Sequence, residues 1–112
     1  MKSIKLKAAE DQIGGAKIIF TTYELLRTAV NNTPEQGGFS VDEMMKRLRI
    51  LDKLDEYKDA FTGNDKDKIL ESEAVLELED SDFEKLKTLF AQVKWGVISK
   101  FIVDLSQEIN SI

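Results

Sequence analysis

The 112-residue chain contains no cysteine and no histidine. Without cysteine it has no disulfides, no thiolate metal sites and no cysteine nucleophile. Without histidine it lacks the side chain that most often serves as a general base or a metal ligand, and a Ser-His-Asp triad cannot form. No glycine-rich phosphate-binding loop is present either. We therefore predict a protein that is not an enzyme and that uses no metal or cofactor.

Basic charge and long apolar runs are also scarce. The 21 acidic residues outnumber the 16 basic ones, which gives a net charge of −5. Because phosphate contacts require an excess of basic charge, we expect no direct binding of nucleic acid. The apolar runs are far too short for a membrane span, and the polar N-terminus lacks the apolar core of a signal peptide. A cytoplasmic protein without a membrane partner is the expectation.

Length and composition predict one folded domain. The chain is 42% hydrophobic and 33% charged, as expected for one modest core beneath a heavily charged surface. We find no internal repeat and no linker that would divide the chain, so a single domain over residues 1–112 is predicted.

Three Ser/Thr-x-x-Glu segments mark helix starts at Thr21, Ser40 and Ser81. In such a capping box the hydroxyl accepts from an amide of the first turn, and the glutamate reaches back to the cap residue. Thr33–Gln36 has the form of a further helix start that Gly37 stops within one turn. With the apolar periodicity, these signals predict helices over residues 22–31, 41–61, 82–93 and 97–110.

The longest predicted helix, over residues 41–61, has an apolar stripe with steps of three and four residues. The stripe consists of Met44, Leu48, Leu51, Leu54, Tyr57 and Phe61. Met45 and Ile50 lie off it and, with Ile19 or Val97, are expected to form a second apolar surface. A small domain with apolar residues on both sides of its longest helix often self-associates, so we predict a homodimer.

Three segments predict strands. Residues 3–8 and 73–79 alternate between apolar and polar side chains. Residues 17–21 are apolar and β-branched and predict a buried strand, with a helix continuing into the next element as the alternative. The polar segment 64–68 lacks the glycine and glutamate of an EF-hand loop and is expected to be a turn. The predicted fold class is α+β, with about four amphipathic helices packed on a small two- or three-stranded sheet.

The stretch from Glu71 to Glu84 holds seven acidic residues and no basic one. On the predicted strand, one face carries four glutamates: Glu71, Glu73, Glu77 and Glu79. Together with Asp80 and Asp82 they form a candidate surface for a basic protein partner. In the extreme form, the carboxylates would mimic the phosphates of nucleic acid.

A structural interpretation of this acidic stretch is favoured. A charged strand face discourages edge-to-edge aggregation, and aspartates are favourable at the start of a helix. Lys5 and Lys7 share one strand face and are expected to pair across the sheet with Glu77 and Glu79.

Arg47 and Trp95 are the other candidate partner-binding residues. Arg47 would anchor a carboxylate of a partner or of the acidic strand, although a solvated helix flank is the favoured interpretation. Trp95 lies at a predicted helix break. Tryptophan is common at binding hot spots, but it also serves as a partly exposed core residue, which is favoured here.

Two segments resemble small proteins carried by tailed phages and prophages. They are Gly38–Leu54 and Leu76–Phe83, the latter followed by Trp95 near a helix break. The resemblance implies an accessory protein that acts through protein contacts, and it carries no catalytic residues with it.

The predicted function is therefore a protein–protein interaction module. The alternatives are a structural or assembly component of a virion, and an acidic inhibitor of a host enzyme that binds nucleic acid.

Overall fold

The computed structural model describes residues 1–32 and 37–112, so the helix start expected at Thr33–Gln36 lies outside the described residues. The described elements, in chain order, are β1 (Lys2–Leu6), β2 (Ala8–Ile13), β3 (Ala16–Thr21), α1 (Thr22–Asn31), α2 (Val41–Asp55), α3 (Lys58–Phe61), α4 (Lys66–Glu71), β4 (Ala74–Leu78), α5 (Asp80–Gln92) and α6 (Lys100–Ser111). The α+β class is confirmed. Within the described ranges there are six helices and four strands, more than the sequence predicted.

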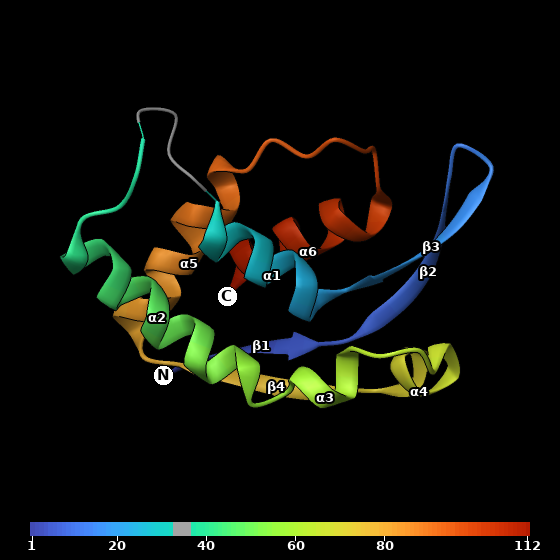
Figure 1. Cartoon of the computed structure of the whole chain (residues 1–112), viewed down its shortest axis with the longest axis horizontal. Coiled ribbons are helices and arrows are strands. Elements are labelled where there is room, and N and C mark those ends of the chain that lie inside the picture. Colours follow the sequence, from blue (N-terminus) through green and yellow to red (C-terminus); the bar gives the residue numbers. More distant parts are fainter. Residues whose placement is uncertain (33–36) are drawn as a thin grey trace.

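The strands form two separate two-stranded antiparallel sheets instead of one sheet. β1 pairs with β4, and β2 pairs with β3 in a hairpin. The hairpin turn is Gly14–Gly15, with φ of 57° and 86°, and two successive positive φ angles are what a type I′ turn requires. Residues 17–21 are therefore a strand and not the start of a helix. As Figure 1 shows, the chain runs from β1 through a bend directly into β2. The N-terminal segment therefore contributes one strand to each of the two sheets.

β2 was missed in the sequence because its residues are unusual for a strand. Apart from Ile13 at its end, β2 has no β-branched or aromatic side chain, and its intrinsic preference for strand is low. Tertiary pairing with the β-branched β3 decides its conformation.

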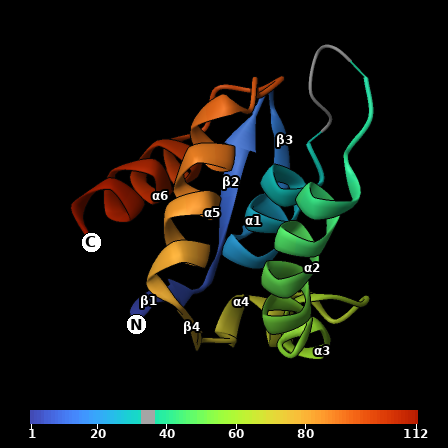
Figure 2. The same ribbon diagram turned by 90° about the vertical axis from the view of Figure 1, so that its left-hand side faces the viewer.

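The core lies between the inner face of the β1–β4 sheet and the helices. Figure 2 shows α1, α2 and α5 beside one another above this sheet, with α6 on the outer side of α5. The largest fully buried side chains come from all of these elements: Ile4, Leu6, Tyr23, Leu26, Ile50, Leu54, Leu76, Leu78, Phe83, Leu86, Leu105 and Ile109. One core is therefore built from both ends of the chain.

The long helix predicted over residues 41–61 is interrupted. α2 ends at Asp55, and only the short α3 continues after it. Tyr57 leaves helical geometry at the break, and its hydroxyl donates to the backbone oxygen of Val75 in β4 (2.8 Å). This contact between distant parts of the chain could not be read from helical periodicity.

The apolar stripe predicted for this helix was also wrong in its first half. Met44 and Leu48 are 45% and 53% exposed. The buried face of α2 instead consists of Arg47, Ile50 and Leu54. The helix has apolar residues on two sides, and its position against α1 and α5 selects which side is buried.

Two further segments differ from expectation. The polar segment 64–68 leads into α4, where the Asp65 carboxylate accepts from the Lys68 amide (3.1 Å) and caps the helix. The last predicted helix starts at Lys100 and not at Val97. Ser99 is its cap, and its hydroxyl accepts from the amide of Ile102.

Candidate protein-interaction site

The acidic residues predicted to share one strand face do not all lie on one element. Glu71 is the last residue of α4. Glu73 and Glu77 flank the exposed Val75 on the outer face of the β1–β4 sheet, and Glu79 precedes α5. All four glutamates are exposed.

Half of the predicted acidic set has a cationic neighbour. Glu73 pairs with Lys5 (3.6 Å), and Asp80 pairs with the amino group of Met1 (3.1 Å). Asp82 is largely buried and accepts from Arg49 (3.0 Å).

The remaining members of the acidic set, Glu71, Glu77 and Glu79, have no ion pair within residues 1–32 and 37–112. The predicted pairing of Lys5 and Lys7 with two of these glutamates is wrong. The strand register places Lys5 opposite Val75, two residues from Glu73, and Lys7 reaches Glu108 of α6 instead (3.7 Å).

Arg47 is a buried structural residue, so the expectation of a solvated flank was wrong. Its side chain is 9% exposed, and its guanidinium donates to the carbonyl oxygens of Val30 (2.9 Å) and Asn32 (2.8 Å). These carbonyls belong to the C-terminal end of α1, whose last turn has no basic residue of its own. Arg47 therefore supplies from α2 the positive charge that stabilises this helix end. The ring of Phe39 lies 4.4 Å from the guanidinium carbon.

Glu43, one turn earlier on α2, forms an ion pair with Arg47. The glutamate accepts from Arg47 Nε (3.0 Å) and also pairs with Lys85 of α5. Hydrogen bonds from Lys85 and then Arg47 lower the pKa of Glu43 below its usual value. The three side chains join α2 to both neighbouring helices.

A second polar cluster joins α1 to the end of α2. The Tyr23 hydroxyl (2.8 Å) and the Arg27 guanidinium (2.6 Å) both donate to Oδ1 of Asp55. Burial raises the pKa of Asp55, but the hydrogen bonds from Tyr23 and Arg27 outweigh it and hold that pKa below its usual value. Burial and the bond to Asp55 raise the pKa of Tyr23 to about 12.

These pKa shifts predict stability that is constant near neutral pH and falls at both extremes. The carboxylates with lowered pKa, Glu43 and Asp55, stabilise the fold above the carboxyl pKa of the unfolded chain, near 4, and this contribution is lost as the pH falls through the lower folded values. The raised pKa of Tyr23 stabilises the fold below its unfolded pKa, near 10, and this contribution is lost as the pH rises toward 12.

Urea denaturation between pH 2 and pH 12 would measure this profile. Asp55→Asn is the comparison variant, and it should be less stable at neutral pH and less sensitive to acid. A change in stability centred near pH 6.5, where histidine would titrate, contradicts the prediction for this histidine-free chain.

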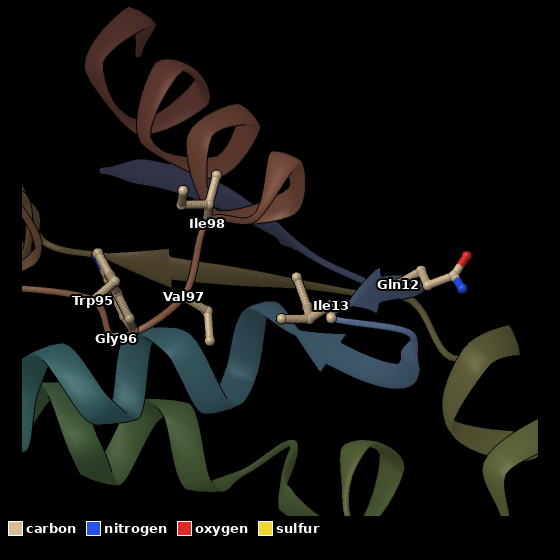
Figure 3. Close-up of a pocket in the computed structure, with 7 residues that line it drawn as sticks. Gln12, Ile13, Trp95, Gly96, Val97 and Ile98 are labelled. Atoms are coloured by element: carbon tan, nitrogen blue, oxygen red, sulfur yellow. The ribbon is translucent and has the colours of Figure 1, made fainter.

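Trp95 borders a cleft of about 470 Å³ between the hairpin tip and the connection from α5 to α6. In Figure 3 the side chain of Ile13 points toward Val97 across this cleft, whereas Gln12 points away from it. The Trp95 ring is half-buried and lies 5.4 Å from the ring of Phe90. Next to it, Ile98 is 96% exposed. Trp95 thus packs on the core with one side and leaves an edge at the cleft.

The largest run of exposed apolar side chains on one helix lies on α2. We call Val41, Met44, Met45 and Leu48 the α2 stripe. These residues recur at steps of three or four and are 71%, 45%, 58% and 53% exposed. Their side chains make a continuous apolar row that faces solvent.

A hollow adjoins the α2 stripe on the side of α1. It measures about 200 Å³ and is lined by Val30, Asn31, Phe39, Met44, Arg47, Leu48 and Leu51. Phe39 and Met44 have the spacing of a hydrophobic staple around the Ser40 cap, so the start of α2 also shapes the hollow. An apolar row beside a hollow suits a helix that inserts one or two side chains.

The residues predicted to form a second apolar surface, Met45 and Ile50 together with Ile19 or Val97, do not lie on one surface in the structure. Ile50 is fully buried, whereas Met45 belongs to the α2 stripe. Val97 does not contribute to the α2 stripe and instead lines the cleft beside Trp95. Sequence reasoning assigned Met44 and Leu48 to the core. The signal for the true arrangement was the presence of two apolar rows on one helix.

The chain was compared with models of protein families, with curated proteins and with solved structures, and none of them matches it. In the part that the structure describes, no helix is both long enough and apolar enough to cross a membrane. The same residues contain no group of three or more acidic side chains placed to hold a metal ion. The function must therefore be argued from the surfaces themselves.

Proposed function

We propose that this protein is a protein–protein interaction module that acts through non-catalytic contacts and docks a helix of a partner on the α2 stripe. A cytoplasmic phage or prophage accessory protein is the setting that its sequence pattern suggests. The observation that carries the proposal is the solvent-facing apolar row of α2 beside the hollow at Phe39. Exposed apolar rows of this kind mark contact surfaces, because leaving them in water is unfavourable.

The charges at the end of the stripe indicate the chemistry of the partner. Asp52 lies one helical turn after Leu48 on the same side, and Glu56 follows one turn later. Both are exposed, and neither has an ion pair among the residues described. We therefore propose an amphipathic helix with apolar residues at steps of three or four, followed by a lysine or arginine that meets Asp52.

A second copy of the chain does not suit this surface. In a two-fold antiparallel pair of α2 helices centred on Leu48, residues equidistant from the centre face each other. Asp52 of one copy would then meet Met44 of the other. Covering a carboxylate with an apolar side chain is unfavourable, so a different protein is the better occupant.

The acidic surface is the weaker candidate. Three of its six residues are occupied by cations of the same chain, and Glu71 lies apart on α4. Glu77 and Glu79 remain exposed, which keeps docking of a basic partner, as in an inhibitor of a nucleic-acid-binding enzyme, as the second proposal.

Affinity capture from a bacterial lysate with matched variants tests the α2 proposal. Leu48→Lys places a charge in the stripe, and Val103→Lys places one at an equally exposed apolar position of α6; the two residues are 53% and 52% exposed. A partner retained by the native chain and by Val103→Lys should be lost with Leu48→Lys, and weakened by Asp52→Lys. A captured set that does not change in Leu48→Lys, or a native chain that retains nothing, overturns the proposal.

A further inference from the structure

The hollow beside the α2 stripe is large enough for an aromatic ring. Its volume is about 200 Å³. An apolar cavity of roughly 150 Å³ holds benzene, so the hollow has room for a six-membered ring that carries a substituent. A leucine side chain has fewer carbon atoms than such a ring and would leave part of the hollow without contacts.

The residues that line the hollow range from buried to exposed. Val30 is buried in the core, whereas Met44 and Leu48 are about half exposed. A side chain that enters beside these two residues therefore comes close to the core and loses much of its contact with water. Side chains buried in this way in a pocket contribute most of the affinity of many protein contacts.

Three groups in the lining interact specifically with aromatic rings. The ring of Phe39 packs favourably against a second ring, and the thioether of Met44 packs favourably against a ring edge. The guanidinium of Arg47 attracts the negative face of a ring. Phe39 already uses this attraction, because its ring lies 4.4 Å from the guanidinium carbon. An aliphatic side chain gains none of these three interactions.

The hollow is unsuited to a charged group. Among the described residues that line it, Arg47 is the only charged one. Its guanidinium already pairs with Glu43 and donates to the carbonyl oxygens of Val30 and Asn32. A carboxylate or an ammonium group in the hollow would lose its hydration without gaining a free ion-pair partner. The lining therefore suits a neutral ring.

We propose that the hollow binds an aromatic ring, and that this ring is the anchor side chain of the partner helix, a phenylalanine or a tyrosine. The assignment to a helix rests on the proposed function, because it requires a partner on the α2 stripe. The ligand class depends only on the size and the lining of the hollow.

The position of the hollow also sets a spacing in the partner. Leu48 lies between Met44 and Leu51 in the lining, and Asp52 follows Leu48 by four residues, about 6 Å along the helix axis. A helix that lies along α2 would therefore carry its aromatic anchor and the basic residue that meets Asp52 three or four positions apart.

Titration with benzyl alcohol and with cyclohexylmethanol tests the ligand class, because these two molecules differ only in the aromaticity of the ring. Cyclohexylmethanol is the more hydrophobic, so a hollow that recognises apolar surface alone would bind it more tightly. Benzyl alcohol should instead bind at least about threefold more tightly. In NMR spectra its ring should shift the methyl signals of Val30, Met44 and Leu48, and the signals of the exposed Val103 on α6 should not move.

Phe39→Leu combined with Met44→Leu is the matched variant, because it keeps the hollow apolar and removes the ring and the sulfur. It should bind the two alcohols about equally, with a circular dichroism spectrum like that of the native chain. Equal affinities in the native chain, or shifts as large at Val103 as in the hollow, overturn the proposal.

Competition separates this inference from the proposed function. Saturating benzyl alcohol should release a partner captured by the native chain, and cyclohexylmethanol at the same concentration should release at least about threefold less. A partner that stays bound in benzyl alcohol shows that its anchor is not in the hollow, even if Leu48→Lys abolishes capture and so supports docking on α2. Binding of benzyl alcohol by a chain that captures no protein supports the ring site and overturns the partner helix.

Discussion

Replacing Arg47 by methionine is expected to lower the free energy of unfolding by about 3 kcal/mol. The substitution keeps much of the side-chain volume but removes the donors to the carbonyl oxygens of Val30 and Asn32. It also removes the charge that stabilises the end of α1 and the cation that lies over Phe39. Because the guanidinium is buried, water cannot replace these bonds at the same positions. Urea denaturation at neutral pH measures the loss.

Arg49→Met is the matched control for this prediction. Arg49 lies on the same helix and also pairs with a carboxylate, Asp82, but its side chain is 57% exposed. Asp82 is largely buried, but it lies in the first turn of α5, where the helix amides continue to stabilise its charge, and Arg49 itself is mostly in water, so the expected loss is only about 1 kcal/mol. Arg47→Lys should be intermediate, since an ammonium group keeps the charge without the fork of donors. Equal losses for Arg47→Met and Arg49→Met would show that Arg47 has no special structural role.

Replacing Ile50 by alanine is expected to cost about 3 kcal/mol, whereas Leu48→Ala on the same helix should cost less than about 0.5 kcal/mol. Ile50 is fully buried, so truncation removes apolar contacts and leaves a cavity. Leu48 is 53% exposed, and its truncation leaves no cavity. Both substitutions make alanine in a helix, so differences in helix propensity are small.

The slope of the urea transition should be the same for both variants if each unfolds in a single step. A loss for Leu48→Ala as large as that for Ile50→Ala would mean that the α2 stripe belongs to the core. That result would remove the basis of the proposed docking surface. Conversely, a tolerant Leu48 shows that the side chain is available for a partner.

The helices beginning near Thr21, Ser40 and Ser81 were predictable because their start signals are local. The hydroxyls of Thr21 and Ser40 accept from the amides of Glu24 and Glu43, three residues later, as the capping boxes indicated. Near Ser81 the helix starts slightly earlier, at Asp80, after a cap at Glu79 without a side-chain bond. Such differences of one or two residues are expected where several residues are able to start a helix.

The strands were predictable only where their residues favour a strand. Residues 2–6, 16–21 and 74–78 alternate or are β-branched, and the predicted strands overlap them. β2 has no such signal, and its pairing with β3 depends on the Gly14–Gly15 turn. The division into two sheets was likewise not visible, because it depends on the bend at Lys7, where hydrogen bonds to Thr22 anchor the chain.

In the candidate site, too, the sequence predicted the local features but not the contacts between distant residues. The sequence placed acidic residues in one stretch, but the cations that neutralise Glu73, Asp80 and Asp82 come from β1, the N-terminal amino group and α2, respectively. The sequence singled out Arg47 as a candidate partner-binding residue, but the carbonyl oxygens that its guanidinium binds lie at the end of α1. Partners from distant parts of the chain set the role of a charged side chain, and local sequence patterns do not identify these partners.

The sequence by itself determined the absence of cysteine and histidine chemistry, the acidic net charge, the α+β class and the starts of the main helices. Each of these follows from composition or from contacts within a few residues. Only the tertiary structure decided which side of α2 is buried, that Arg47 stabilises the end of α1, and that a hollow adjoins the α2 stripe. The physical reason is that burial depends on which elements meet in space. A helix with two apolar rows is locally consistent with either orientation, and packing against α1 and α5 selects one.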